Sequence, residues 1–194
     1  MQSEQIPLEI PRRRDRMRKE SWIRTVLDES GFGALATAVG DRPRLNINLF
    51  VFDQTRDAIY LHTARRGETR SRIEPGVPAA FAVAHMGRIL TAEAAIDFSV
   101  EYASVVVTGT ARIIQDDEEA SRALRLLMRK YAPQLEPGVD YRDVEAADLA
   151  RTTVYRLDIE SWSGKENRAP EEAEAFDYPG ARSRGHRAGR GARR

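Results

Sequence analysis

The stretch AIYLHTARRGETR, residues 58–70, decides the fold of this chain more than any other segment. Alternating apolar residues predict a strand over 58–64, with one histidine, His62, in the middle of it. The following residues, ARRGETR, hold a glycine and three arginines and predict a turn that enters a short helix. Backbone N–H groups and arginines at such a turn are typical of a phosphate site. A solvent-exposed turn before a surface helix explains the same pattern.

Length and composition place the chain among ordinary globular proteins. Its 194 residues suit one domain with a sizeable core. It contains no cysteine, which excludes disulfides, a thiolate nucleophile and cysteine metal ligands. No apolar run is long enough to span a bilayer and no signal-peptide pattern is present, so we expect a cytoplasmic protein without a membrane partner.

The net charge of +1 conceals a basic tail. Six arginines and no acid lie in residues 182–194, and without these arginines the net charge is −5. Such a tail either contacts nucleic acid or acidic lipid, or is only disordered and solubilising. We expect an extended arm over 1–11, one domain over 12–167 and a disordered basic tail over 168–194, with no nucleic-acid partner.

Strands dominate the expected domain. Alternating or continuous apolar runs predict six strands, over 33–38, 44–52, 58–64, 79–86, 104–115 and 152–162. Helical patterns cover 12–30, 68–74 and 116 to about 131, whereas 87–102 fits strand, loop or short helix. Gly109 marks a bend or bulge. This order, without regular βαβ alternation, predicts a mainly β fold, an antiparallel barrel with peripheral helices.

The strand predicted over 44–52 alternates polar and apolar residues. Four apolar residues share one face, and two asparagines and two phenylalanines share the other: Leu45, Ile47, Leu49 and Val51; Asn46, Asn48, Phe50 and Phe52. Amides can bind the polar edge of a planar ligand and an aromatic ring can cover its face. An amphipathic strand with a merely exposed asparagine face gives the same alternation. Trp162 can likewise cover a planar ligand, or belong to the core or to a dimer interface.

Several common site motifs are absent from the sequence. It has no Walker loop, no GxGxxG sequence and no HxxxH or CxxC spacing. Its histidines are His62, His85 and His186, so a metal site would need distant residues, and we expect none. No serine has the context of a nucleophile elbow, which leaves a hydrolase with little support.

The order and spacing of five segments resemble those of a known family. The segments are GALATA at 33–38, PRLNINLFVFD at 43–53, AIYLHTARRGETRSRIEPG at 58–76, EYASVVVTGTARIIQDDEEASRALRLLMRKYAP at 101–133 and TTVYRLDIESWSGK at 152–165. Together they resemble the FMN-binding split-barrel proteins related to pyridoxamine 5′-phosphate oxidase, in particular the branch of nitroimidazole-resistance proteins. The resemblance, over roughly residues 12–168, implies a six-stranded antiparallel split β-barrel that forms a homodimer with FMN between the subunits.

The resemblance also implies roles for individual residues. Strand residues 46–49 would face the isoalloxazine and ribityl chain, residues 62–64 would follow along the cofactor, and the turn at 67–70 would take the phosphate. Trp162 and Lys165 would reach the partner's flavin. His62 matches an active-site histidine of the nitroimidazole-resistance branch and is the candidate catalytic proton donor. The implied cofactor-binding residues are Asn46, Ile47, Asn48, Leu49, His62, Thr63, Ala64, Arg66, Gly67, Thr69, Arg70, Ser104, Trp162 and Lys165.

The phosphate turn departs from the pattern of its relatives. Glu68 and Thr69 stand where relatives often have lysines. A carboxylate repels phosphate unless it points away, and Arg72, four residues on, is a partner that could hold it. The arginines of the turn would then supply the positive charge. The longer C-terminal substrate segment of the pyridoxamine phosphate oxidases proper is not matched, so their substrate is not expected.

We therefore expect an FMN-dependent oxidoreductase with a small-molecule electron acceptor, which for this branch includes nitro compounds. Two alternatives stay open. In one, the same fold binds a deazaflavin or haem in place of FMN. In the other, the protein is a non-enzymatic stress protein that holds a flavin or nucleic acid without turnover.

Overall fold

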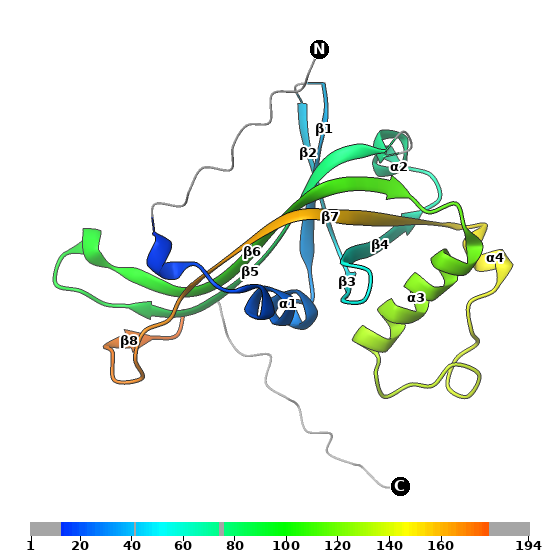
Figure 1. Cartoon of the computed structure of the whole chain (residues 1–194). Coiled ribbons are helices and arrows are strands. Elements are labelled where there is room, and N and C mark those ends of the chain that lie inside the picture. Colours follow the sequence, from blue (N-terminus) through cyan, green and yellow to red (C-terminus); the bar gives the residue numbers. More distant parts are fainter. Residues whose placement is uncertain (1–12, 41, 74–75, 179–194) are drawn as a thin grey trace, which may run out of the picture.

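The structure, a computed structural model, describes residues 13–40, 42–73 and 76–178 (Figure 1). Its strands are β1 (Gly33–Val39), β2 (Arg42–Asn48), β3 (Phe50–Asp53), β4 (Ala58–Ala64), β5 (Val77–Leu90), β6 (Ser99–Ile113), β7 (Thr152–Asn167) and β8 (Ala175–Phe176). Its α-helices are α1 (Glu20–Glu29), α2 (Glu68–Ile73), α3 (Asp117–Tyr131) and α4 (Ala146–Leu149), with 3-10 turns η1 (Arg14–Arg16) and η2 (Ala95–Asp97). The predicted mainly β fold with peripheral helices is confirmed.

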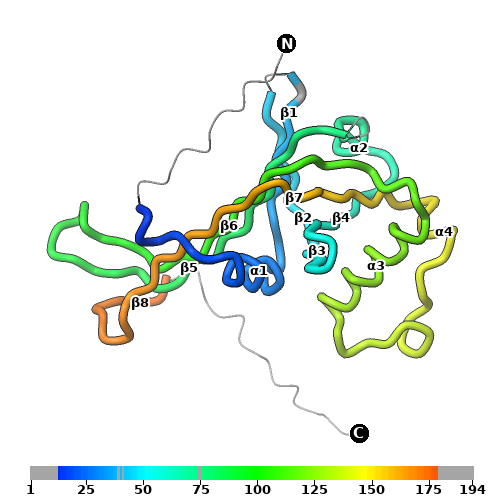
Figure 2. Tube along the Cα trace, in the orientation of Figure 1, coloured from blue at the N-terminus to red at the C-terminus, as the bar shows by residue number. Residues whose placement is uncertain are grey.

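The strands form one antiparallel sheet that curls on itself. The order is β2-β1-β5-β6-β7-β4-β3, and β8 pairs with β5. The long strands β5, β6 and β7 run through the centre of the molecule (Figure 2). Strands β2 and β3 stand at opposite ends of this order, yet only Leu49 separates them in the chain. The sheet must therefore bend round until its two edges meet, as a split barrel does.

The described sheet has eight strands because one predicted strand is divided and one strand was not expected. The predicted run 44–52 breaks at Leu49, where the chain leaves its partner β1 and joins β4. The short β8 adds an eighth strand next to Ile89 and Leu90. This strand lies within the segment 168–194 that the sequence assigns to the tail. Residues 179–194 and the predicted arm over 1–11 lie outside the described residues.

Apolar side chains fill the inside of the curled sheet beneath α1. Ile23, Val26 and Leu27 of α1 are buried against inward residues of the strands. At the centre, the rings of Phe50 and Phe81 meet edge to face with centroids 4.7 Å apart. A second cluster forms on the outer side of the sheet, where α3 packs on β3, β4 and β7. Within the described residues, no helix is long and apolar enough to cross a membrane.

The N-terminal helix is shorter than predicted over 12–30. Residues before α1 pair with β7 instead: the amide of Arg18 donates to the carbonyl of Gly164 at 2.9 Å, and Met17 forms a bridge with Lys165. This pairing explains why the helix begins only at Glu20. The prediction for Gly109 is confirmed, because the β6–β7 register shifts between Thr108 and Gly109. A Cβ at Gly109 would collide with the carbonyl of Asp158.

The segment 87–102, which the sequence left open, extends the sheet beyond the barrel. Strand β5 continues to Leu90 and β6 starts at Ser99, with η2 between them. Together with the end of β7 and with β8, these residues form an arm at the left of Figure 1. The β5–β6 register shifts between Met86 and Ile89, so the arm carries a bulge.

Candidate functional site

In strand β2 the apolar face is exposed and the asparagine face is half-buried. This is the reverse of an ordinary amphipathic strand. Leu45 and Ile47 are 72% and 70% exposed, and Leu49, just after the strand, is exposed as well. Asn46 and Asn48 are half-buried. The alternative that the asparagine face is merely the exposed side is therefore wrong. The apolar face is the one open to solvent.

The polar face of β2 lies against α2. The amide nitrogen of Asn46 donates to the hydroxyl of Thr69 at 2.8 Å, and Arg44 donates to the carboxylate of Glu68 at 2.8 Å. Thr69, which stands where relatives often have a lysine, thus fixes the orientation of Asn46. These two contacts bring the predicted ring-binding strand and the predicted phosphate turn together.

Asn48 differs from Asn46 in having no partner. Its Nδ2 atom is buried and makes no hydrogen bond within residues 13–40, 42–73 and 76–178. An unpaired buried donor costs about 1–3 kcal/mol, so an acceptor placed next to it would be favourable. Asn48 lies opposite Gly33 on β1, and a Cβ at Gly33 would collide with the ring of Phe81. The sheet is therefore packed tightly behind the unpaired amide.

The basic turn between β4 and α2 keeps a positive character despite Glu68. The carboxylate of Glu68 forms ion pairs with Arg44 at 2.8 Å and with Arg72 at 3.1 Å. The predicted contact with Arg72 is confirmed. The hydrogen bond from Arg44 and the charge of Arg72 lower the pKa of Glu68, so the carboxylate stays ionised and compensated. Arg65 and Arg66 are exposed.

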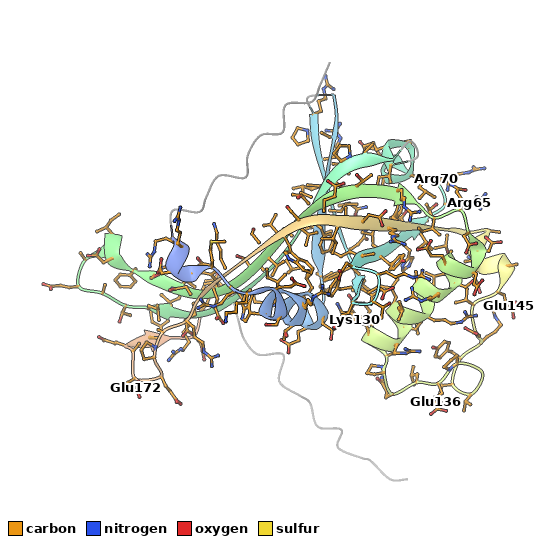
Figure 3. All side chains as sticks on the ribbon, in the orientation of Figure 1. Arg65, Arg70, Lys130, Glu136, Glu145 and Glu172 are labelled. Carbon is orange, nitrogen blue, oxygen red and sulfur yellow. The ribbon has the colours of Figure 1, made fainter. Side chains whose placement is uncertain are left out.

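Beside the turn lies a small cavity of about 170 Å³, lined in part by Arg65, Arg70, Thr152 and Thr153. Arg70 donates to the hydroxyl of Thr153 at 3.0 Å. Figure 3 shows Arg65 and Arg70 at the same end of the molecule, near α2. The cavity is thus lined by two guanidinium groups from the turn and α2, by two threonine hydroxyl groups from β7, and by the carboxylate of Asp117. Guanidinium and hydroxyl groups are suitable ligands for a phosphate.

Sequence reasoning missed three residues of this region: Arg44, Thr153 and Tyr155. The last two come from β7, whose register with β4 places Thr153 opposite Thr63. The hydroxyl groups of Thr63 and Tyr155 lie 2.9 Å apart. A period-two alternation in TTVY was visible in the sequence. This alternation does not show which strand β7 pairs with.

His62 lies near the end of β4, opposite Val154 of β7. Its side chain is exposed, and within the described parts of the chain it makes no hydrogen bond. Partial desolvation by the surrounding strands lowers the pKa of the imidazole. The ring is therefore mainly uncharged at neutral pH, able to donate through one nitrogen and accept through the other.

The C-terminus of α3 supports the joint between β2 and β3. The hydroxyl of Tyr131 accepts from the amide of Phe50 at 3.0 Å and lies 2.7 Å from the carbonyl of Gly31. The amine of Lys130 lies 4.0 Å from the centroid of the Phe50 ring and donates to the carbonyl of Leu27 at 3.2 Å. Burial lowers the pKa of Lys130 to about 8. These contacts hold the backbone next to Leu49 in place.

Three predicted cofactor residues lie elsewhere in the chain. Ser104 of β6 is opposite Lys165 of β7, and the ring of Trp162 packs edge to face on Phe52 beneath the guanidinium of Arg24. Among the described residues, no hydrogen bond or ion pair joins these three to β2 or α2. One chain thus brings together Asn46, Thr69 and the basic turn, and keeps the β6–β7 residues apart from them.

Comparison with known proteins agrees with this architecture. The family model described as pyridoxamine 5′-phosphate oxidase matches residues 19–166. A search of curated proteins gave no significant match.

Several solved structures share the fold at low sequence identity. The flavocytochrome Anf3 from Azotobacter vinelandii is 20% identical, with a TM-score of 0.71 over 88% of this chain and 76% of that one. An FAD and haem binding protein from Mycobacterium smegmatis is 22% identical, with a TM-score of 0.70 over 80% and 75%. A candidate 5-nitroimidazole antibiotic resistance protein from Bacteroides thetaiotaomicron is 16% identical, with a TM-score of 0.63 over 76% and 84%. With the family model matching most of its length, this chain belongs to the pyridoxamine 5′-phosphate oxidase family.

Proposed function

We propose that this protein is a homodimeric flavin-dependent oxidoreductase. The observation that carries the proposal is the Asn48 amide, a buried donor without a partner on the polar face of β2. Its neighbour Asn46 is already oriented by Thr69. The family to which the chain belongs, and the flavin named in two of the similar structures, support a flavin as the missing acceptor.

The residues of this region fit the parts of a flavin nucleotide. Amide donors suit the polar pyrimidine edge, and exposed aliphatic side chains such as Ile47 and Leu49 suit the ring plane. The exposed Arg65 and Arg66 suit a phosphate. The cofactor of our proposal is FMN, because one basic turn of this kind accommodates one phosphate group.

The chain's own residues would orient the cofactor and hold or transfer a proton. A bound flavin supplies the redox chemistry by accepting and releasing electrons at its ring. Asn46 and Asn48 would hold the polar edge of the ring through their amide donors. His62, uncharged at neutral pH, holds or passes a proton at an imidazole nitrogen. The small-molecule electron acceptor is not defined by these residues, and reduction of a nitro group is one reaction to test.

A second copy of the chain would complete the site. Leu45, Ile47 and Leu49 leave an apolar stripe exposed on β2, as expected of a surface that is buried on association. Ser104, Trp162 and Lys165 are separated from β2 and α2 within one chain, so we propose that they act on the flavin held by the partner. The test is the mass in solution: wild type should sediment as a dimer and Ile47→Asp as a monomer.

Haem is a second candidate ligand, favoured by a specific observation. The imidazole of His62 is exposed and uncharged at neutral pH, so one ring nitrogen offers the free lone pair that an axial haem ligand needs. Two of the similar structures are those of a flavocytochrome and of an FAD and haem binding protein. His62→Ala should abolish haem binding under this alternative. Under the flavin proposal it should lower turnover and leave flavin affinity nearly unchanged.

The decisive experiment is a spectrum of the purified protein followed by separate titrations with FMN, FAD, deazaflavin and haem. We expect FMN to bind, and Asn48→Leu to weaken it about tenfold or more, as loss of one buried hydrogen bond does. Thr110→Val, a polar-to-apolar change on β6, is the matched control and should bind like wild type. No binding of a flavin at micromolar concentration would overturn the proposal.

A further inference from the structure

The arm formed by the ends of β5, β6 and β7 and by β8 has one apolar face (Figure 1). Five residues of β5, β6 and β8 make up this arm patch, and the strand registers place them on the same side of the sheet: Met86, Ile89, Val100, Tyr102 and Phe176. Met86 and Phe176 are 49% and 47% exposed, although both side chains are large and apolar. Such a patch is typical of a surface that another segment covers.

Helix α1 lies on the opposite face of the arm and does not cover the arm patch. His85, the neighbour of Met86 in β5, points to that opposite face, where its Nε2 lies 2.7 Å from the hydroxyl of Ser30 at the end of α1. Glu101, the neighbour of Tyr102 in β6, also points away from the patch and forms an ion pair with Arg88 at 2.8 Å. The polar contacts of the arm thus lie on one face and the arm patch on the other.

The N-terminal part of the chain enters the described structure beside the arm patch. The guanidinium of Arg16 stands 5.8 Å from the centroid of the Tyr102 ring, and its Nη1 donates to the Tyr102 hydroxyl at 3.5 Å. The bridge between Met17 and Lys165 then holds the next residue on the edge of β7. Residues 1–12, which lie outside the described residues, therefore join the chain a few residues from the patch.

The sequence of residues 1–12 matches the chemistry of the arm patch. Ile6, Leu8 and Ile10 recur at every second position, and Pro7 and Pro11 disfavour a helix. In an extended chain, three such side chains share one side, and each residue advances the chain by about 3.3 Å. The three aliphatic residues then come within about 10 to 23 Å of the first described residue along the chain. This reach is sufficient for the patch, whose three strands span about 10 Å.

Attachment to the same chain favours this segment over a separate partner. A tethered segment acts at a high effective concentration, of the order of millimolar for a short linker, so that a small patch is enough to hold it. A separate protein needs a larger interface, of about 800 Å² on each partner.

We propose that the N-terminal segment, residues 5–11, of the same chain packs on the arm patch. Ile6, Leu8 and Ile10 cover Met86 and Phe176, and the segment shields the patch from solvent and from other proteins. The proposal goes beyond the flavin site and holds whether or not the chain binds a flavin.

Because the chain contains no cysteine, disulfide trapping in the full-length protein is a direct test. Met86→Cys is combined in turn with Ile6→Cys, Leu8→Cys and Ile10→Cys, and each double variant is oxidised mildly. A disulfide requires the two Cα atoms to come within about 7 Å. We expect at least one pair to form an intrachain disulfide, seen as a faster non-reduced band of monomer mass.

The matched control is Leu8→Cys with Val139→Cys, whose side chain is 79% exposed on the loop between α3 and α4. The pairs with Met86→Cys should close about tenfold faster than this control, as a raised effective concentration predicts. No pair that closes faster than the control overturns the proposal. Disulfides that join two chains also overturn it, because a second copy then covers the patch.

A second measurement needs no cysteine. The dye 1-anilinonaphthalene-8-sulfonate fluoresces on exposed apolar surface, so Leu8→Asp should increase its fluorescence about twofold by releasing the segment from the patch. Gln5→Asp adds the same charge outside the aliphatic series and should leave the fluorescence at the wild-type level. Equal dye fluorescence in wild type and Leu8→Asp would contradict the proposal.

Discussion

Two outer surfaces of the same sheet contrast sharply. Over β3, β4 and β7, helix α3 buries Val51 and Val154, and Tyr60 and Arg156 donate to Glu119 at 2.6 and 2.8 Å. On β2, no described residue covers Leu45 or Ile47. The covered surface supplies contacts that hold the fold. The uncovered one keeps an apolar stripe open to solvent, which is what association with a second copy needs.

The largest expected effect is a loss of stability when a buried side chain is removed from the covered surface. Leu127→Ala removes a buried side chain beneath α3 and should lower the free energy of unfolding by about 2–5 kcal/mol. Ile47→Ala, an equally apolar truncation on the exposed stripe, should change the stability of the monomer by less than about 0.5 kcal/mol. Urea melts of both variants at low protein concentration measure the difference. Equal losses would show that the two surfaces do not differ as described.

A smaller effect concerns the acids on the covered surface. Burial alone would raise the pKa of Asp53 and Glu119, but hydrogen bonds, from Thr55 and Arg122 to Asp53 and from Tyr60 and Arg156 to Glu119, outweigh it and lower both values. Because the folded pKa values are depressed, these groups stabilise the fold above the unfolded values of about 4. This stability is lost as the pH falls through the folded pKa values.

Urea melts from pH 6 to pH 2 test this expectation. The double variant Asp53→Asn, Glu119→Gln should be less stable at pH 6 and should lose less stability on acidification than wild type. Glu136→Gln, on an exposed loop, is the control and should follow the wild-type curve. Parallel curves for wild type and the double variant would rule out this role for the two acids.

A substitution at Asn48 should stabilise the ligand-free protein, in contrast to the losses expected on the covered surface. Asn48→Leu removes an unpaired buried donor, so without ligand it should raise the free energy of unfolding by about 1 kcal/mol. The same change should weaken flavin binding. Thermal melts with and without FMN separate the two effects, since only wild type should gain a large shift from the cofactor. A less stable variant without ligand would mean that the amide is already satisfied.

A further effect, confined to alkaline pH, concerns the joint between the two surfaces. Burial lowers the pKa of Lys130 to about 8, so between this value and its ordinary pKa the unfolded chain binds more protons than the folded one. Stability should therefore rise with pH over this window through this group. Lys130→Met should flatten that rise, whereas Lys19→Met, at an exposed position before α1, should not. Melts at pH 7, 8, 9 and 10 measure it.

Local features of the fold could be predicted from the sequence. The strand at 33–38 and the contact of Glu68 with Arg72 depend on neighbouring residues or on one helical turn, and the bulge at Gly109 was indicated by the glycine itself. The family resemblance was confirmed by the family match. The polar residues of β2 and of the basic turn before α2 were also placed on the elements where the structure has them, whereas their role in cofactor binding stays a prediction.

Features that depend on distant pairing could not be predicted. Alternation showed that β2 has two faces, but which face is covered depends on α2, which brings Thr69 to Asn46. The break at Leu49 follows from the two different partners of β2 and β3. The contact between Ser30 and His85 joins residues 55 positions apart, and no sequence pattern around either residue predicts it.

The single-residue link at Leu49 also bears on how the chain folds. It joins two local hairpins, β1–β2 and β3–β4, each of which needs only neighbouring residues to form. Pairing of β4 with β7 instead brings Ala64 next to Thr152, across a long stretch of chain. Such distant pairing is slow because a large loop must close first. The two hairpins should thus form early, and the barrel should close only when the last long strand arrives.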